Sequence, residues 1–140
     1  MRKTLVFGLI AAAAAFTWAS AAPVAYKANL TGAAEVPPVQ SAGKGTATVT
    51  ADPATKQVTY NVEFSGLSGP AAAAHIHCGA AAGANAGVSV PLGAANPASP
   101  ITGQATMTDA QLADLQAGKC YVNVHTAANK GGEIRGQLAP

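Results

Sequence analysis

Short runs of alternating apolar and polar residues, separated by glycine, proline and asparagine, cover most of this 140-residue chain. In a β-strand successive side chains point to opposite faces, so such runs predict strands with one buried face. Many short strands with turn residues between them are typical of an antiparallel sandwich. The pattern predicts an all-β fold of two packed sheets with strands at 25–30, 45–51, 57–64, 73–78, 88–92, 101–107, 120–126 and 133–138.

One short helix is predicted between the sixth and seventh strands. Thr108 can cap its N-terminus, and Gln111, three residues later, completes a capping box. Leu112 and Leu115 form an apolar stripe, and Gly118 is a natural stop. We expect this helix to cover one end of the sandwich.

The first 21 residues have the pattern of a secretory signal peptide. Arg2 and Lys3 precede an uncharged apolar stretch that is too short to span a bilayer. Ala19 and Ala21 form the small-residue pattern that signal peptidase accepts. We therefore expect cleavage after Ala21 and one domain over 22–140, periplasmic or secreted, with no stable membrane insertion.

The expected domain is electrically neutral. The whole chain carries a formal charge of +2, and both excess cations, Arg2 and Lys3, belong to the signal peptide. A neutral domain lacks the basic surface of a nucleic-acid-binding protein. We therefore expect no nucleic-acid partner.

The chain has two cysteines, Cys78 and Cys120. In an oxidising compartment an even pair forms a disulfide more often than it stays as two thiols. We expect a Cys78–Cys120 disulfide, which would join the strands predicted at 73–78 and 120–126.

All three histidines fall on those same two strands. His75 and His77 are two residues apart, so they share a face with Cβ atoms roughly 6–7 Å apart. By the same alternation His125 lies on the face opposite Cys120. Three converging imidazoles predict a site for Cu(II) or Zn(II) with a position open to water or another ligand. The alternative is that the histidines only form hydrogen bonds with neighbouring side chains.

Three polar residues are candidates to surround this cluster. Asn123 shares a face with His125, and Glu133 and Arg135 share a face of the last strand. Asn123 and Glu133 could accept hydrogen bonds from the ligands, and Arg135 could attract an anion. The alternative for Glu133 and Arg135 is a surface ion pair. We predict no catalytic residues, because the chain lacks paired carboxylates, a nucleophile elbow and a phosphate loop.

Spaced motifs at 30–38, 66–67, 75–77, 118–126 and 131–138 together resemble the CHRD domain, a family named after chordin. The resemblance implies a Greek-key, immunoglobulin-like β-sandwich, here as a single-domain exported protein of bacterial type. The domain also occurs as repeats in chordin, an extracellular antagonist of growth factors. Membership of the family implies no settled activity.

A looser resemblance is to copper-zinc superoxide dismutase, also a Greek-key sandwich. It implies that His75, His77 and His125 are copper ligands and that Arg135 guides anions. The chain departs from that enzyme because it has no fourth copper histidine, no bridging histidine and no loop rich in histidine and aspartate to hold zinc. An efficient dismutase is therefore not expected, whereas a copper site is compatible with the sequence.

These observations leave three hypotheses for function. The first is an extracytoplasmic protein that binds copper, or alternatively zinc, for storage, delivery or protection. The second is an interaction module without a metal, which recognises an extracytoplasmic protein or matrix partner. The third is a copper redox enzyme similar to superoxide dismutase, against which the missing second metal site counts. We favour a binding protein over an enzyme.

Overall fold

The structure, a computed structural model, describes residues 20–140. The predicted signal peptide lies outside these residues, apart from Ser20 and Ala21, which are exposed. Within the described residues all eight predicted strands are confirmed, with ends that differ by two residues at most. The elements are β1 (Val24–Thr31), η1 (Gly32–Ala34), β2 (Lys44–Asp52), β3 (Gln57–Ser65), β4 (Ala71–Cys78), β5 (Val88–Pro91), β6 (Ile101–Thr106), α1 (Asp109–Gln116), β7 (Cys120–Thr126) and β8 (Ile134–Gln137).

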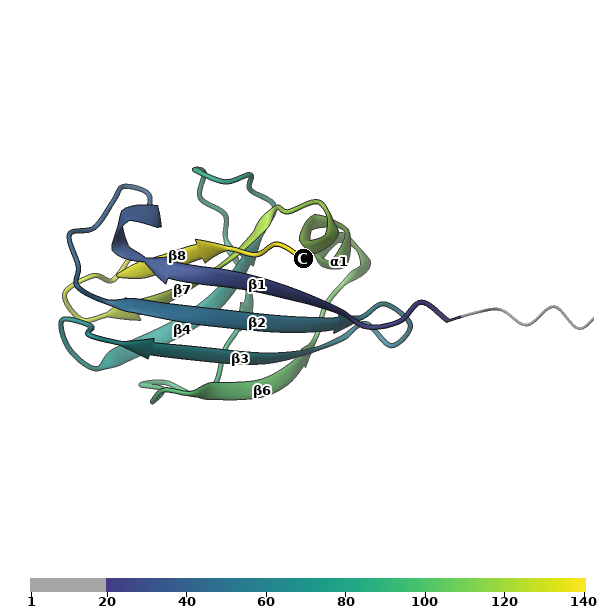
Figure 1. Cartoon of the computed structure of the whole chain (residues 1–140), viewed down its shortest axis with the longest axis horizontal. Coiled ribbons are helices and arrows are strands. Elements are labelled where there is room, and N and C mark those ends of the chain that lie inside the picture. The colour runs from purple at the N-terminus through teal and green to yellow at the C-terminus, as the bar shows by residue number, and fades with distance from the viewer. Residues whose placement is uncertain (1–19) are drawn as a thin grey trace, which may run out of the picture.

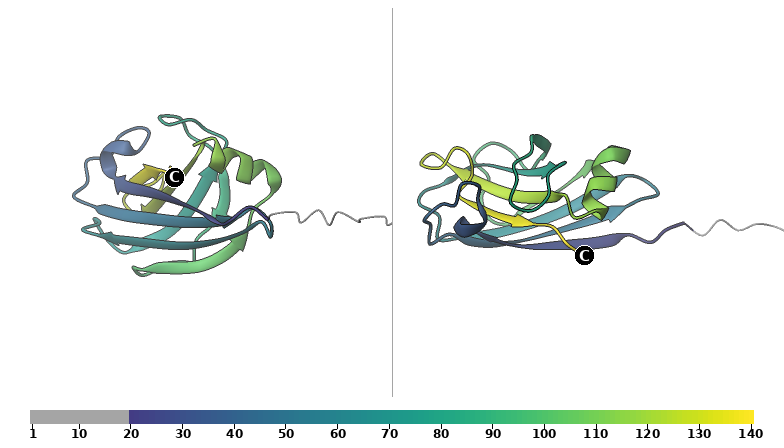
Figure 2. Two further views of the ribbon diagram at one scale, coloured as in Figure 1. Left: turned by 45° about the vertical axis from the view of Figure 1, so that its right-hand side comes forward. Right: turned by 90° about the horizontal axis from the view of Figure 1, so that it is seen from above.

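The strands form one folded sheet rather than two separate sheets. All neighbours are antiparallel, in the order β5-β4-β7-β8-β1-β2-β3-β6. β1 and β8 share the registered pair of Thr31 and Arg135, and just after β8 Ala139 forms a bridge with Lys27 of β1. The sheet turns over at this junction, so its two halves lie over one another as the layers of a sandwich (Figures 1 and 2).

Gly136 permits the close approach of the two halves. A Cβ atom at this position would overlap the carbonyl oxygen of Asn29 and would lie 2.9 Å from Leu30 Cδ2. Any side chain on β8 at this point would therefore push β1 away. The β-sandwich is confirmed, and the absence of a side chain at the junction explains why its layers remain hydrogen-bonded to each other.

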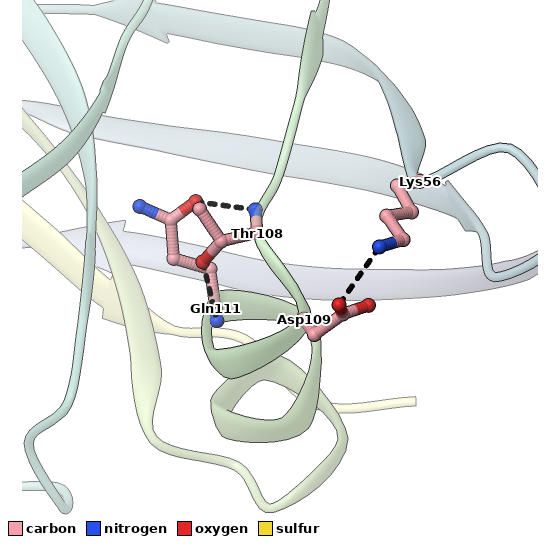
Figure 3. A network of polar contacts seen from close by, with 4 residues as sticks. All are labelled: Lys56, Thr108, Asp109 and Gln111. Atoms are coloured by element: carbon pink, nitrogen blue, oxygen red, sulfur yellow. Dashed lines mark hydrogen bonds and ion pairs between the residues drawn. The ribbon is translucent and has the colours of Figure 1, made fainter.

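The helix α1 has the predicted ends and the predicted buried face. Thr108 Oγ1 accepts a hydrogen bond from Gln111 N at 3.2 Å, and Gln111 Oε1 accepts one from Thr108 N at 2.9 Å (Figure 3). Leu112 and Leu115 are buried in the core. No helix within residues 20–140 is long and apolar enough to cross a membrane.

An exposed ion pair joins α1 to the turn between β2 and β3. Lys56 Nζ lies 2.7 Å from Asp109 Oδ2, and both side chains face solvent (Figure 3). Such exposed pairs contribute less than about 1 kcal/mol to stability. The helix is therefore held mainly by its buried leucines.

The strand β7 is buried along its whole length. One face, with Val122 and Val124, packs into the core. The other face carries Tyr121, Asn123 and His125, all of which are also buried. Loops cover this second face, including residues 79–87, the teal loop at the top of Figure 1. Polar side chains are thus enclosed between the sheet and its loops.

Candidate metal centre

The three histidines converge on one face of the β4–β7 pair. In the antiparallel register His77 lies opposite Tyr121, and His125 lies opposite Ala73. Each histidine offers one ligand atom, and these atoms all lie within 4.8 Å of one another. His75 Nδ1 is 2.9 Å from His125 Nε2. The predicted convergence is confirmed, and the imidazoles are close enough to share one ion.

The Cys78–Cys120 disulfide is present and holds these two strands together. The two cysteines face each other in the register, one residue beyond the pair formed by His77 and Tyr121. A slip of one residue between the strands would turn His125 toward the core, because side chains alternate between faces. The covalent link prevents such a slip next to the cluster.

Backbone carbonyl groups orient two of the three rings. His77 Nδ1 lies 2.9 Å from the carbonyl oxygen of Ala86, and His125 Nδ1 lies 2.9 Å from that of Lys130. A carbonyl oxygen only accepts hydrogen bonds, so each Nδ1 carries a hydrogen and donates it. In His125 this leaves Nε2 with a lone pair, as in histidines that bind a metal through Nε2. In His77 the same holds only while Nδ1 keeps the hydrogen, because Nε2 lies 3.0 Å from Asn123 Oδ1, a second acceptor that competes for it.

The contact between His75 and His125 has a defined direction. Because His125 Nδ1 carries the hydrogen, its Nε2 has a lone pair and accepts a hydrogen bond from His75 Nδ1. To bind a metal through Nδ1, His75 would have to carry its hydrogen on Nε2 instead. His75 and His125 would then each offer a lone pair to the same ion.

Burial favours the neutral, metal-binding form of these rings. It is the largest cause that lowers the pKa of His75, and the nearby His125 and His77 lower it further. Burial also lowers the pKa of His125 and outweighs the opposing hydrogen bond to the carbonyl of Lys130. Both imidazoles are therefore neutral at pH 7, and only the neutral ring has the lone pair that a metal requires.

Comparison with known proteins places the chain in a family. The model of the CHRD domain matches residues 26–138, which include the histidine cluster, the disulfide and all eight strands except the first residues of β1. The chain belongs to the CHRD family. No curated protein matches the chain, and no solved structure does.

In this CHRD domain Asn123 contacts a histidine of the cluster, whereas Glu133 has other hydrogen-bond partners. Asn123 is buried, and its Oδ1 is 3.0 Å from His77 Nε2, so its amide would be a direct neighbour of a bound ion. Among the described residues Glu133 accepts no hydrogen bond from a histidine. Its partners hold loops together instead, and they are Ser41, Ser68, Thr126 and Asn129.

Arg135 is buried, with 2% of its surface exposed. Its guanidinium lies over the ring of Tyr121 and donates hydrogen bonds to residues 84 and 85. It forms no ion pair with Glu133 within residues 20–140. Glu133 and Arg135 therefore do not form the surface ion pair that was the alternative prediction. The guanidinium of Arg135 faces a loop instead of open solvent.

Tyr121 and two backbone carbonyls complete the surroundings of the histidines in the CHRD domain. The Tyr121 ring stacks on His77, with centroids 4.7 Å apart and planes 7° apart. Alternation already placed Tyr121 on the face of Asn123 and His125, so its position was readable from the sequence. Nothing in the sequence indicates that the carbonyl groups of Ala86 and Lys130 accept hydrogen bonds from the histidines, because every residue has a carbonyl group.

Glu35 is a buried carboxyl group next to Asn123. It is 5% exposed, and its Oε1 has no hydrogen-bond partner among the described residues. Gly132 leaves room for it, since a Cβ there would overlap Glu35 Oε1. Burial raises the pKa of Glu35 to about 7, although the charge of Arg135 and a hydrogen bond from Asn123 oppose that rise.

We expect Glu35→Gln to stabilise the CHRD domain at high pH. The pKa of Glu35 rises from 4.5 to about 7 on folding, so the wild type loses stability as pH rises through this window. In urea unfolding, the wild type and Glu35→Gln should be equally stable at pH 4.5, and the variant should be more stable by about 2 kcal/mol at pH 8. The same change at the exposed Glu63 should have no such pH dependence. A Glu35→Gln variant less stable than the wild type at pH 8 would contradict this.

Proposed function

We propose that this CHRD domain binds one transition metal ion through His75, His77 and His125, and that copper is preferred over zinc. The observation that carries the proposal is the convergence of three imidazoles whose ligand atoms lie within 4.8 Å of one another. The carbonyl groups that hold two Nδ1 atoms support it further, because they pre-orient the ligands.

The chemistry of the ligands supports copper. Three neutral nitrogen donors suit both Cu(II) and Zn(II), and at equal geometry Cu(II) binds more tightly than Zn(II). Three protein ligands leave at least one position open to water or another ligand. A protein with such a site serves copper storage, delivery or protection.

An extracytoplasmic location is the second part of the proposal. It rests on the disulfide between Cys78 and Cys120, a bond that persists in oxidising compartments. The signal-peptide pattern of the first 21 residues supports the same location. Export to the periplasm or the medium should be visible by fractionation of the producing cells and by cleavage after Ala21.

The metal site is tested by titration of the disulfide-intact protein with Cu(II) and Zn(II) in a calorimeter. We expect one ion per chain, with Cu(II) tighter, and copper spin resonance should show coupling to imidazole nitrogens. A His75→Ala/His77→Ala/His125→Ala variant should lose binding completely. A Gln104→Ala variant, altered on the exposed edge strand β6, serves as the control and should bind like the wild type.

Binding that survives in the triple variant would place the metal elsewhere. No binding by the wild type would contradict the proposal and leave the interaction module as the function of the domain.

A further inference from the structure

A stack of three side chains runs across the sheet beside the histidine cluster. His77 on β4 is parallel to Tyr121 on β7, with ring centroids 4.7 Å apart. Arg135 on β8 places its Cζ atom 3.4 Å from the centre of the Tyr121 ring. Because β7 lies between β4 and β8, His77 and Arg135 contact opposite faces of that ring. The guanidinium gains a cation–π contact and Tyr121 is held from both sides.

The same three side chains bind three consecutive residues of the covering loop. Arg135 Nη2 donates to the carbonyl of Ala84 at 2.6 Å, and Arg135 Nη1 donates to Asn85 Oδ1 at 2.8 Å. The hydroxyl of Tyr121 accepts from Ala86 N at 3.2 Å and lies 3.3 Å from Ala86 O. His77 Nδ1 donates to the carbonyl of Ala86 at 2.9 Å. The loop therefore reaches the cluster through the Ala86 carbonyl.

Residues 79–87 have little structure of their own that could hold this carbonyl in place. The loop contains no strand or helix, and it consists mainly of alanine and glycine. Gly79 and Gly83 have positive φ angles, which are easily reached by glycine but give the segment no rigidity. Its start is held by hydrogen bonds from Gly79 and Ala80 to the Lys119 carbonyl, and Asn85 Nδ2 donates to the Val36 carbonyl. The other hydrogen bonds that fix residues 84–86 on the domain come from Arg135, Tyr121 and His77.

We propose that Arg135 and Tyr121 are positioning residues for the metal ligand His77, and this inference rests on the proposed metal-binding function. They hold residues 84–86 so that the Ala86 carbonyl keeps the hydrogen on His77 Nδ1, against the competing acceptor Asn123 Oδ1, which lies 3.0 Å from Nε2. Nε2 is then the nitrogen available to the ion, and the ring cannot turn. Substitution of such supporting partners of a metal ligand typically lowers metal affinity 10- to 100-fold.

Two conservative variants separate this role from packing. Arg135→Lys keeps the charge but loses the two-pronged contact with residues 84 and 85. Tyr121→Phe keeps both stacked contacts and loses only the hydroxyl that binds Ala86. We expect each variant to bind Zn(II) roughly 10- to 100-fold more weakly in the calorimeter. Gln137→Leu is the matched control, because Gln137 lies on β8 and contacts the far end of the same loop at Ala80. It should bind Zn(II) within about twofold of the wild type.

The decisive measurement is nitrogen NMR of the imidazole rings in the metal-free protein. We expect a protected hydrogen on His77 Nδ1 in the wild type and faster exchange of that hydrogen in both variants. The Nδ1 hydrogen of His125, which binds Lys130 outside this loop, should be unchanged. A purely structural role would affect both rings alike, or neither.

Wild-type affinity and unchanged His77 protection in Tyr121→Phe would overturn the inference, even if Arg135→Lys failed to fold. Failure of the wild type to bind Zn(II) or Cu(II) would instead remove the proposed function. The NMR comparison would then still decide whether the loop contacts fix His77, because it needs no metal.

Discussion

Replacing Glu133 with alanine should lower the free energy of unfolding by about 3–5 kcal/mol. The side chain is fully buried, with 0% of its surface exposed, and its carboxylate accepts five hydrogen bonds. Truncation would remove all five at once and leave their donors without this partner, among them the hydroxyl of Thr126, which is buried. The donors lie on three separate segments of the chain, and they are Ser41 Oγ, Ser68 N, Ser68 Oγ, Thr126 Oγ1 and Asn129 Nδ2.

The effect of Glu133 should depend on pH. Burial by itself would raise the pKa of Glu133, but hydrogen bonds from Ser68, Thr126 and Ser41 outweigh it and lower the pKa to about 2. Because the ordinary value is 4.5, the carboxylate stabilises the fold above pH 4.5, and this contribution is lost as pH falls toward 2.

Urea unfolding of the wild type and Glu133→Gln measures this dependence. The difference between their free energies of unfolding should be largest at pH 7 and should shrink between pH 4.5 and pH 2. Glu63→Gln, on the exposed face of β3, is the control and should unfold like the wild type at pH 7. A loss below about 1 kcal/mol for Glu133→Gln at pH 7 would show that the five contacts are not a stabilising network.

Removal of the disulfide should also have a large effect. We expect Cys78→Ala/Cys120→Ala to lower the free energy of unfolding by about 4 kcal/mol. The bond joins residues 42 positions apart, and its removal frees a long loop in the unfolded chain. Urea unfolding of the wild type with and without reductant should show the same loss. Reductant should leave the double variant unchanged, which separates the disulfide from other effects of the reagent.

The disulfide also bears on the metal site. It links β4 and β7 directly beside His77 and Tyr121, so its loss should loosen the register that brings the histidines together. We expect the double variant to bind copper more weakly than the wild type under conditions where it is still folded. If the reduced and oxidised wild type had the same free energy of unfolding, the expected stabilisation by the disulfide would be wrong. If the double variant bound copper as tightly as the wild type, the expected effect on the metal site would be wrong.

Most of the local structure of this CHRD domain was readable from the sequence. Alternation predicted the strands to within two residues, because one buried face imposes a period of two on the side chains. The capping residue Thr108 marked the helix, because its side chain satisfies a backbone donor that the helix leaves free. The same alternation brought His75, His77 and His125 to one face and Cys78 and Cys120 to the other.

The partners of the buried polar groups depend on contacts between segments that are distant in the chain. Glu133 was expected near the histidines, but its donors Ser41 and Ser68 lie 92 and 65 residues away in the chain. The loop over the cluster and the turn of the sheet at Gly136 likewise depend on how distant segments meet. Alternation is a local property of each strand, whereas the partner of a buried carboxylate or imidazole depends on the paths of the loops. The strands and their faces therefore follow from the local residue pattern, whereas the folding of the sheet brings together the groups that meet there.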